Sequence, residues 1–398
     1  MHKPFFAEFD QCRNLRSIPN LIKWQWYAED VLPMWVADMD FPAPQPIRAA
    51  IQRVLDHGVL GYASASFSLF EQIAVRMQRL YDWKIAPESI VPISSVNVGY
   101  QVAASLVCQP GEGVLIQPPI FYRFVDFPAT YHLTRQDAPL RLVQRGRTIA
   151  YEFDRESFTR ARNAGAKTAM FLLCHPHNPM GRIFSEEELE WMADVCVEND
   201  TLICSDDIHH ELLLGGARYT PLAARVPHCA ERTITLIGAG KSFNVSGLNC
   251  AFAIIPQPAL RQRFVRELER LGLEVNSLGL AAAQAAYSGE CDNWLAALRA
   301  YLTANRDFLV NFIANELPRL RTTVPEATYL AWLDCSACVQ AGDITGSPYE
   351  FFLQRAKVAL TNGATYGPGG ENFVRLNFAC ARSTLEEGLQ RMRKALSQ

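Results

Sequence analysis

The sequence lacks the features that would direct a chain to nucleic acid, to a membrane or out of the cell. Its net charge is −3 and its basic residues are scattered, so it offers no positive field for a phosphate backbone. The longest stretch without a charge, residues 89–111, is rich in serine, asparagine, glutamine and proline, unlike a membrane span. Glu8 and Asp10 lie where a signal peptide needs its apolar core. We expect a cytoplasmic protein that binds neither nucleic acid nor membrane.

Clustered cysteines are scarce as well. The chain has 11 cysteines, an odd number, and many lie in apolar runs, where cysteine behaves as a small hydrophobic residue. Cys335 and Cys338 have C-x-x-C spacing, but no second pair supplies the remaining ligands of a zinc site. We therefore predict a structural role for both, and a reducing cytoplasm fits the composition.

The chain does have a strong alternation of strand and helix patterns. With 398 residues and 49% hydrophobic content it can form a large domain and a smaller one. Thr168–Cys174 is a continuous apolar strand, a helix capped by Ser185 and Glu188 follows, and residues 201–204 and Thr233–Ile237 form two further strands. This β-α-β order predicts an α/β fold with a parallel sheet and right-handed crossovers.

The pattern changes near residue 290. Long leucine-rich helical spacing covers residues 294–317, a glycine-rich turn covers 363–370, and strands are predicted at 328–334 and 373–378. The first 40 residues carry tryptophans in an irregular pattern, as in an arm packed on another surface. We expect an N-terminal arm over residues 1–45, a large domain over 46–290 and a small domain over 291–398.

Several local elements are also predicted. A helix begins near Pro46 and ends at Gly58, and Ser68 with Glu71 forms a capping box for the next helix. Residues 94–99 lead into an apolar helix over 100–107, and residues 348–359 form a further helix. The start of the helix near residue 100 can hold a phosphate with its free N–H groups, although a plain buried helix with a serine cap explains the pattern equally well.

Lys241 is the unusual residue of the chain. It follows the third predicted strand on a turn with Gly238 and Gly240, and residues 242–260 after it carry no charge. A surface charge at a loop tip is the simpler reading. A desolvated lysine, however, has a depressed pKa and becomes a nucleophile towards carbonyl groups.

Two chemistries fit the residues at the strand ends, where parallel sheets gather their ligands. The first is a metal-dependent hydrolase with a cluster of six side chains: His175, His177, Asp206, Asp207, His209 and His210. Neighbouring residues on an extended chain point to opposite faces, so about half of these at most could meet one ion. The second is a pyridoxal 5′-phosphate site, which also uses Lys241 and Arg375 and needs no metal.

Four motifs occur in an order that resembles the fold-type I aminotransferases. They are Asn-Pro-Met-Gly at 178–181, Ser-Asp-Asp-Ile-His at 205–209, Gly-Lys-Ser-Phe-Asn at 240–244 and Phe-Val-Arg-Leu-Asn at 373–377. Residues 32–41, 61–62 and 328–334 resemble more narrowly the cystathionine β-lyase and cysteine-S-conjugate β-lyase branch. The resemblance runs nearly end to end. It implies the aspartate aminotransferase fold, with a mixed, mostly parallel sheet in the large domain and a smaller α+β domain.

The resemblance implies roles for the residues around the cofactor ring. Lys241 would be the Schiff-base lysine and the proton carrier, and Asp206 the partner of the pyridinium nitrogen. Asn178, with His209, would neighbour the ring hydroxyl, and Phe121 would stack on the ring.

It also implies where the phosphate would bind. Val96, Asn97 and Ser242 would contact the phosphate within one chain, and Tyr62 would reach the phosphate of the adjacent subunit. The last role requires a homodimer with shared sites, in which Tyr62 counts among the catalytic residues.

The amino-acid substrate would bind on the other side of the ring. Arg375 would hold its α-carboxylate near the backbone of Ala37, and Tyr122 would face the ring or the substrate as a third catalytic residue.

The chain departs from the family pattern at several positions. Gly238 and Gly240 replace serines that often contact the phosphate, Met180 replaces a threonine, and Asp207 replaces a glutamate. We expect the two glycines to affect phosphate binding and the other two changes to affect rate or substrate choice.

The implied activity is carbon–sulfur β-elimination, which converts L-cystathionine or a related cysteine S-conjugate to a thiol, pyruvate and ammonia. The same residues serve transamination, so an aminotransferase is the alternative, and the choice depends on the narrower resemblance. A regulatory protein that binds the cofactor without turnover is the non-enzyme alternative.

Overall fold

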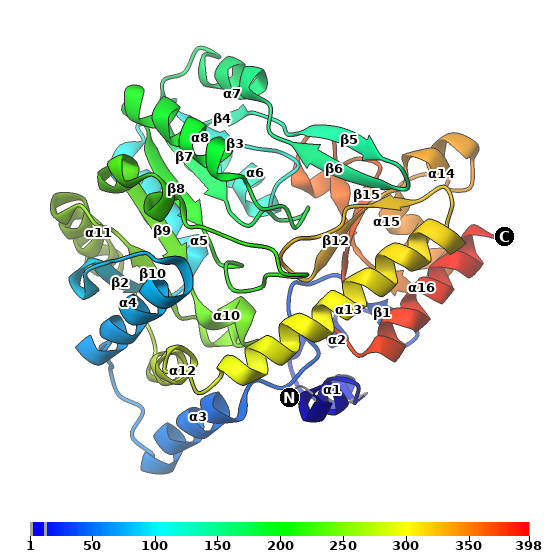
Figure 1. Ribbon diagram of the computed structural model, residues 1–398, viewed down its shortest axis with the longest axis horizontal. Coiled ribbons are helices and arrows are strands. Elements are labelled where there is room, and N and C mark those ends of the chain that lie inside the picture. The colour runs from blue at the N-terminus through cyan, green and yellow to red at the C-terminus, as the bar shows by residue number, and fades with distance from the viewer. Residues whose placement is uncertain (1–2, 12–13, 398) are drawn as a thin grey trace.

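The computed structural model describes residues 3–11 and 14–397 of the chain. One half of the molecule is organised around a seven-stranded sheet with the order β2-β10-β9-β8-β7-β3-β4 (Figure 1). Strand β10 is antiparallel to both of its neighbours, and the other strands run parallel to one another. The strands are β2 (Ile90–Ile93), β3 (Gly113–Ile116), β4 (Thr134–Asp137), β7 (Thr168–Cys174), β8 (Leu202–Asp206), β9 (Thr233–Ile237) and β10 (Ala251–Ile254). The prediction of a mixed, mostly parallel sheet is therefore confirmed.

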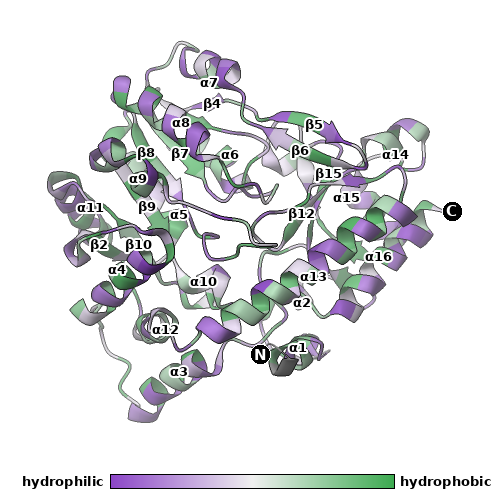
Figure 2. Ribbon diagram, in the orientation of Figure 1, coloured by the Kyte–Doolittle hydropathy of each residue, from purple (hydrophilic) through white to green (hydrophobic). Residues whose placement is uncertain are grey.

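The central strands are buried on both faces. Successive residues of β7 alternate between two apolar clusters: Met170 and Leu172 belong to one, and Phe171 and Leu173 to the other. The first cluster includes α5 (Val96–Val107) and α11 (Pro258–Leu271), and the second includes α7 (Arg155–Arg162) and α8 (Glu186–Glu198). Figure 2 shows the contrast between the hydrophobic strands β7 and β8 and the hydrophilic residues of α7. Helices on both faces thus leave the strand ends as the accessible part of the sheet.

A second sheet organises the C-terminal part of the chain. Its four antiparallel strands are β11 (Arg321–Thr322), β12 (Leu330–Asp334), β15 (Phe373–Asn377) and β14 (Thr361–Asn362), in that order. Helices α13 (Asp292–Glu316) and α16 (Arg382–Leu396) lie side by side in Figure 1, in yellow and red. The predicted division at residue 290 stays a prediction, although all seven strands of the first sheet precede it and all four of the second follow it.

The first residues pack on the C-terminal part of the chain. Helices α1 (Lys3–Phe9) and α2 (Ile22–Gln25) precede β1 (Leu32–Pro33), which pairs in parallel with β13 (Val358–Ala359). Phe9 is fully buried, with its ring 5.6 Å from that of Trp294. The N-terminal segment is therefore held against residues about 300 positions later in the chain.

The remaining elements connect these layers. Four helices lie on the side of the molecule that contains the seven-stranded sheet: α3 (Gln45–His57), α4 (Phe67–Tyr81), α10 (Ala239–Ser242) and α12 (Ser277–Tyr287). The other short elements are α6 (Tyr122–Thr130), α9 (Leu222–Arg225), α14 (Ser336–Ala341), α15 (Pro348–Phe351), β5 (Arg141–Arg145) and β6 (Thr148–Glu152). No helix in the described residues is both long and apolar enough to cross a membrane.

Helix α3 confirms its prediction, because it contains Pro46 in its first turn and stops at Gly58 with φ 70°. The predicted capping box of α4 is wrong. Ser66, and not Ser68, is the N-cap residue, and its hydroxyl accepts a hydrogen bond from the Leu69 N–H at 3.3 Å. Ser66 has the extended backbone that an N-cap needs, whereas Ser68 already lies in the first helical turn.

The predicted helix over residues 348–359 is only partly present. Helix α15 continues into a π-helical turn, Phe352–Ala356, and Lys357 then adopts φ 55° and turns the chain into β13. Pairing of β13 with β1 competes with helix continuation, and sequence spacing gives no sign of so distant a partner.

Candidate active site

The carboxyl ends of β7, β8 and β9 meet at one edge of the sheet. Asp206 is the last residue of β8 and lies opposite Cys174 of β7 and Leu236 of β9. We predict from the sequence that this strand ends at residue 204, which is two residues too early. Pairing with both neighbouring strands extends it to Asp206. Lys241 lies on the short helix α10 directly after β9, so the structure brings the predicted strand-end residues to one place.

Lys241 is partly buried, and its Nζ donates a hydrogen bond to the Ala37 carbonyl at 2.6 Å. The pKa of Lys241 is lowered to about 8, because the effect of burial exceeds that of the Asp38 carboxylate, which raises it; the Arg375 charge also lowers this pKa and the Asp206 carboxylate raises it. An appreciable fraction of this amine is therefore uncharged near neutral pH, as a nucleophile or base requires.

Asp206 is a buried carboxyl group in the electrostatic neighbourhood of Lys241. Its Oδ1 accepts a hydrogen bond from the Ile208 N–H at 3.1 Å. The pKa of Asp206 is raised to about 7, because the effect of burial exceeds the opposing effects of the Ile208 N–H and the Lys241 charge. A second cation at this carboxyl group would hold it ionised, which suits the partner of a protonated ring nitrogen.

Arg375 reaches the same site from β15 of the other sheet. Its Nη1 donates to Asn178 Oδ1 at 3.2 Å, and its Nη2 donates to the Trp35 carbonyl at 2.8 Å and to Thr361 Oγ1 at 3.2 Å. The residue is 4% exposed, and its Nε has no hydrogen-bond partner. Among the described residues no carboxylate forms an ion pair with it, so this guanidinium is available to a carboxylate from outside the chain.

The two predicted aromatic residues flank the site at the start of α6. The Phe121 ring lies 5.7 Å from that of Phe124, which packs 5.0 Å from Tyr100, and Asp206 contributes to the raised pKa of Tyr100. Phe121 is therefore connected to the surroundings of Asp206 through the packed rings of Phe124 and Tyr100.

Tyr122 is the first residue of α6, and its ring lies 4.9 Å from that of Phe121. Burial raises the pKa of Tyr366, Tyr122 adds to that rise, and the Tyr366 ring lies 5.4 Å from the Arg375 guanidinium. Tyr122 is thus in the neighbourhood of Arg375.

His209 is buried beside both cations. Burial lowers its pKa well below the usual value, and the charges of Lys241 and Arg375 lower it further, so the ring is neutral. Its ring centre lies 6.1 Å from that of Tyr329, and its Nδ1 has no hydrogen-bond partner. A neutral imidazole here can exchange a hydrogen bond with a bound molecule.

The first turn of α5 lies over the end of β9. Gly99 packs so closely that an added Cβ would lie 2.7 Å from Leu236 Cδ2. The helix begins at Val96 rather than at residue 100, because the Ser95 hydroxyl accepts from the Val98 N–H at 3.2 Å. Free N–H groups of the first turn therefore come from Val96 and Asn97, as an anion site needs.

Among the buried polar atoms that have no hydrogen-bond partner in the structure, one lies in the first turn of α5 and one on α10. They are Asn97 Oδ1 and Ser242 Oγ. Buried polar groups are normally paired, so both atoms fit a site completed by a polar ligand. Together with the amine, the carboxyl group and the free guanidinium, they match what pyridoxal phosphate and an amino acid require.

The two glycines of the lysine turn have a packing reason. A Cβ at Gly238 would lie 3.1 Å from Ile208 Cδ1, and one at Gly240 would lie 3.2 Å from Ser246 Oγ. Serine at either position would force a neighbour to shift. Met180 is 2% exposed in the apolar cluster under α8, so its side chain serves packing there.

Tyr62 is the predicted site residue that the structure does not bring to the others. It is 99% exposed in the loop between α3 and α4, beside Val59 and Leu60, which are 80% and 61% exposed. One chain alone leaves this tyrosine in solvent.

The six residues of the metal alternative do not converge. His175 and His177 bond through Nε2 to the carbonyls of Thr220 at 3.3 Å and Gln117 at 3.2 Å. In the part of the chain that the structure describes, no three histidine, cysteine, aspartate or glutamate side chains are placed to hold a metal ion.

Asp207 points away from the lysine. It accepts hydrogen bonds from the hydroxyl groups of Ser205 and Tyr219, and the neighbouring His210 Nδ1 lies 2.8 Å from the Tyr81 hydroxyl. The alternation of side chains along the strand end separates Asp207 from Asp206.

Sequence reasoning missed several residues that complete the site. The Tyr329 hydroxyl donates to the Ala37 carbonyl at 2.9 Å, and Asn377 Nδ2 donates to the carbonyls of Val36 and Asp38 at 2.7 and 2.6 Å. Tyr329 and Asn377 lie inside motifs that the sequence singled out, but their partners are about 300 residues away, and spacing alone does not reveal such contacts.

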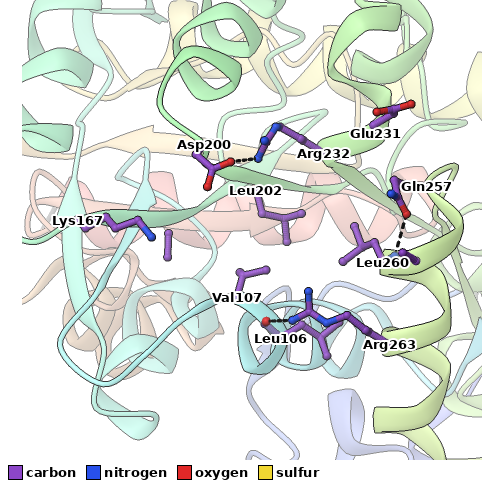
Figure 3. Close-up of a pocket in the computed structure, with 12 residues that line it drawn as sticks. Leu106, Val107, Lys167, Asp200, Leu202, Glu231, Arg232, Gln257, Leu260 and Arg263 are labelled. Atoms are coloured by element: carbon purple, nitrogen blue, oxygen red, sulfur yellow. Dashed lines mark hydrogen bonds and ion pairs between the residues drawn. The ribbon is translucent and has the colours of Figure 1, made fainter.

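A solvent-facing pocket of about 460 Å³ lies at the amino ends of strands β7 and β8 (Figure 3). Three of its charged side chains are already engaged: Arg232 pairs with Asp200, and Arg263 donates to the Leu106 carbonyl. Leu202, at the start of β8, lines it, so the pocket is remote from the strand ends that carry Asp206 and Lys241.

Comparisons with known proteins agree with this geometry. Residues 29–392 match the family model of aminotransferase class I and II. The chain is 36% identical over 388 residues to cystathionine β-lyase PatB of Bacillus subtilis (strain 168), covering 94% of this chain and 96% of that protein. It is 31% identical to protein MalY of Escherichia coli (strain K12), covering 92% and 93%.

Solved structures give the same result. The pyridoxal-phosphate-bound C-S lyase from Staphylococcus hominis has a TM-score of 0.90 and 30% identity, covering 98% of this chain and 99% of that chain. The crystal structure of OvoB has a TM-score of 0.90 and 37% identity with the same coverage. The predicted fold and the resemblance to the cystathionine β-lyase branch are confirmed. This chain belongs to the aminotransferase class I and II family.

Proposed function

We propose that this chain is a pyridoxal 5′-phosphate-dependent carbon–sulfur β-lyase. Its substrate is L-cystathionine or a related cysteine S-conjugate, and its products are a thiol, pyruvate and ammonia. Relatives named cystathionine β-lyase and C-S lyase over nearly the whole chain support this activity. The structural observation that carries the proposal is one partly buried amine, Lys241, whose pKa is lowered by burial and which shares a neighbourhood with Asp206 and Arg375.

The residues at the strand ends hold the cofactor. Lys241 would bind it covalently through Nζ, and the Asp206 carboxylate would pair with its ring nitrogen. Asn178 and His209 contact the ring hydroxyl, and Phe121 packs against the ring. When bound, pyridoxal phosphate withdraws electrons from the substrate Cα and stabilises negative charge there.

The start of α5 would hold the phosphate of the cofactor. The free N–H groups of Val96 and Asn97, the Asn97 side chain and the Ser242 hydroxyl hold it, and the positive end of the helix dipole favours its charge. The unpaired buried atoms of Asn97 and Ser242 support this assignment.

The substrate carboxylate binds Arg375, whose planar guanidinium can donate two parallel hydrogen bonds. In the free protein the Trp35 and Ala37 carbonyls accept the hydrogen bonds of Arg375 and Lys241. Tyr122 lies beside the bound carboxylate.

Lys241 moves the proton. With the cofactor and substrate bound, the uncharged Nζ of Lys241 would take the proton from the substrate Cα. The Cβ–S bond then breaks with its electron pair going to sulfur, and the Lys241 ammonium supplies a proton to the departing thiolate. Water hydrolyses the three-carbon product to pyruvate and ammonia.

We also propose a cytoplasmic homodimer. The exposed apolar loop that carries Val59, Leu60 and Tyr62 lines a surface pocket of about 570 Å³ with Val275 and Leu278, and exposed apolar side chains of this kind mark interfaces. A second copy packed here would bring Tyr62 to the phosphate of its partner. The ten cysteines of the described residues are all free, as in a reducing compartment.

One assay tests the activity. Purified protein is loaded with pyridoxal phosphate and given L-cystathionine, and pyruvate and free thiol are measured with and without a keto acid. The proposal expects both products in equal amounts and no need for the keto acid. An aminotransferase would require the keto acid and release no pyruvate from this substrate, and a regulatory protein would bind the cofactor without turnover.

A further inference from the structure

Residues 35–41, which we name the N-terminal strap, form a peptide without helix or strand that runs between Lys241 and Arg375. Every carbonyl from Trp35 to Met39 accepts a hydrogen bond from a side chain of a distant segment. The strap is held by these side chains, together with the hydrogen bond from the Asp40 N–H to the Ala379 carbonyl at 2.9 Å and the ion pair of Lys23 with Asp40 at 2.9 Å.

Two asparagines hold three of these five carbonyls, those of Val36, Asp38 and Met39. Asn244, three residues after Lys241, donates through Nδ2 to the carbonyls of Met39 at 2.9 Å and Phe41 at 2.7 Å. Its Oδ1 accepts from the Met39 N–H at 3.1 Å. Asn377, two residues after Arg375, holds the carbonyls of Val36 and Asp38. Lys241 and Arg375 are therefore each followed, within three residues, by an asparagine that forms hydrogen bonds with the strap.

The backbone of Asn244 is adapted to this task. It has φ 56°, in the left-handed region where asparagine and glycine are favoured, and this turn aims its amide at the strap. The helix that carries Lys241 has only four residues, Ala239–Ser242. So short a helix gives little rigidity of its own, and the amide of Asn244 fastens it to the strap.

The distance between Lys241 and Arg375 determines whether one substrate molecule can contact both residues. One amino acid must place its carboxylate on Arg375 and its Cα proton against Lys241 at the same time. The strap contacts both residues, through the Trp35 carbonyl to Arg375 and the Ala37 carbonyl to Lys241. A long flexible lysine has many rotamers, and misplacement by about 1 Å can reduce a rate 10²-fold.

We propose that Asn244 is a positioning residue for Lys241: its side-chain amide fastens the lysine turn to the strap and so sets the register between the lysine and the carboxylate held by Arg375. This inference rests on the proposed function. Asn377 fastens the strap from the Arg375 side in the same way.

The test is Asn244→Gly, because glycine keeps the left-handed backbone and removes all three amide hydrogen bonds. Asn249→Gly is the matched control: Asn249 has φ 49° in the same loop, and its side chain is exposed. For Asn244→Gly we expect kcat for pyruvate release to fall about 10- to 100-fold, with KM changed less than about threefold. We expect Asn249→Gly to keep both constants. Asn377→Ala should instead raise KM more than it lowers kcat.

A second readout does not depend on turnover. The absorbance of the lysine–cofactor bond measures how fast cofactor-free protein captures pyridoxal phosphate, and Asn244→Gly should slow this capture relative to Asn249→Gly at equal folded content by circular dichroism. Equal kcat and equal capture rates in the two variants would overturn the positioning role even if the wild type is an active lyase. A wild type that captures the cofactor but cleaves no sulfur substrate would refute only the proposed function, and slow capture by Asn244→Gly would then still support the positioning role. A wild type that takes up no pyridoxal phosphate would overturn both.

Discussion

The two halves of the site are built in different ways. Asp206 and Lys241 stand at or just after the ends of strands buried on both faces, so their surroundings come from a packed core. Arg375 lies within an antiparallel strand and is oriented by hydrogen bonds to Asn178, Thr361 and the strap. The first half shifts pKa values by desolvation, and the second half positions a charge by hydrogen bonds. We infer that the lysine half governs the chemistry and the arginine half governs substrate capture.

Removing the amine should have the largest effect on the lysine half. Lys241→Ala leaves no group to hold the cofactor covalently or to take the Cα proton, so kcat should fall by at least about 10³-fold. Pyruvate release and the cofactor absorbance band measure both losses. Lys167→Ala is the control, because the Lys167 side chain is 63% exposed and remote from the site. Normal turnover by the Lys241 variant would remove the central assignment.

Removing the guanidinium tests the arginine half. Arg375→Ala leaves the substrate carboxylate without its partner, and the loss of a buried pair partner costs about 3–5 kcal/mol, or roughly two to four decades in kcat/KM. Arg375→Lys should recover little, because an ammonium cannot donate two parallel hydrogen bonds to a carboxylate. Steady-state kinetics with L-cystathionine measures both variants, and Arg319→Ala, at an exposed ion pair, serves as the control. An unchanged kcat/KM would mean that another group binds the carboxylate.

The desolvated carboxyl group gives a prediction on stability. Burial raises the pKa of Asp206 from 3.8 to about 7, so the cofactor-free native state binds more protons than the unfolded state between these values. Its contribution to stability is favourable at low pH and is lost as pH rises towards 7. Asp206→Asn should therefore stabilise the cofactor-free protein relative to wild type at pH 8 by at most about 4 kcal/mol, and not at pH 4.

Denaturant unfolding at the two pH values measures this difference. The same variant should lose activity once the cofactor is bound, because asparagine cannot hold the ring nitrogen protonated. A variant with equal stability gain at both pH values would contradict the desolvation argument.

The smallest effect is expected outside both halves. Ser66→Ala removes the N-cap of α4 and should lower the free energy of unfolding by about 1 kcal/mol without changing kcat. Ser68→Ala is the matched control and should cost less, since its hydroxyl does not cap the helix. A larger loss for Ser68→Ala would show that the cap is assigned to the wrong serine.

The sequence predicted the lysine half better than the arginine half. The bounds of Thr168–Cys174 and Thr233–Ile237 follow from continuous apolar runs, and the polar residues after them follow from strand-end logic. Asp206 also follows from strand-end logic, and the family resemblance assigned roles to Asp206 and Arg375. The contacts of the strap with Asn244, Asn377 and Tyr329 join residues about 200 to 340 positions apart, and no local pattern encodes such pairs.

Short-range errors had a different cause. Ser66 and Ser68 are equally good caps by residue type, and only the backbone of the loop before α4 decides between them. The helix expected up to residue 359 stops at Lys357 because β13 finds a partner in β1. Local sequence propensity favours such elements, but tertiary contacts determine where they begin and end.

The location of the covalent bond tests the central claim most directly. The purified protein is loaded with pyridoxal phosphate, reduced with borohydride, digested and analysed by mass spectrometry for the lysine that carries the pyridoxyl group. If Lys241 is the residue that binds the cofactor, we expect modification of Lys241 alone, and none in a sample denatured before loading. Stable modification of a different lysine, or no modification of Lys241 in the folded protein, would contradict it.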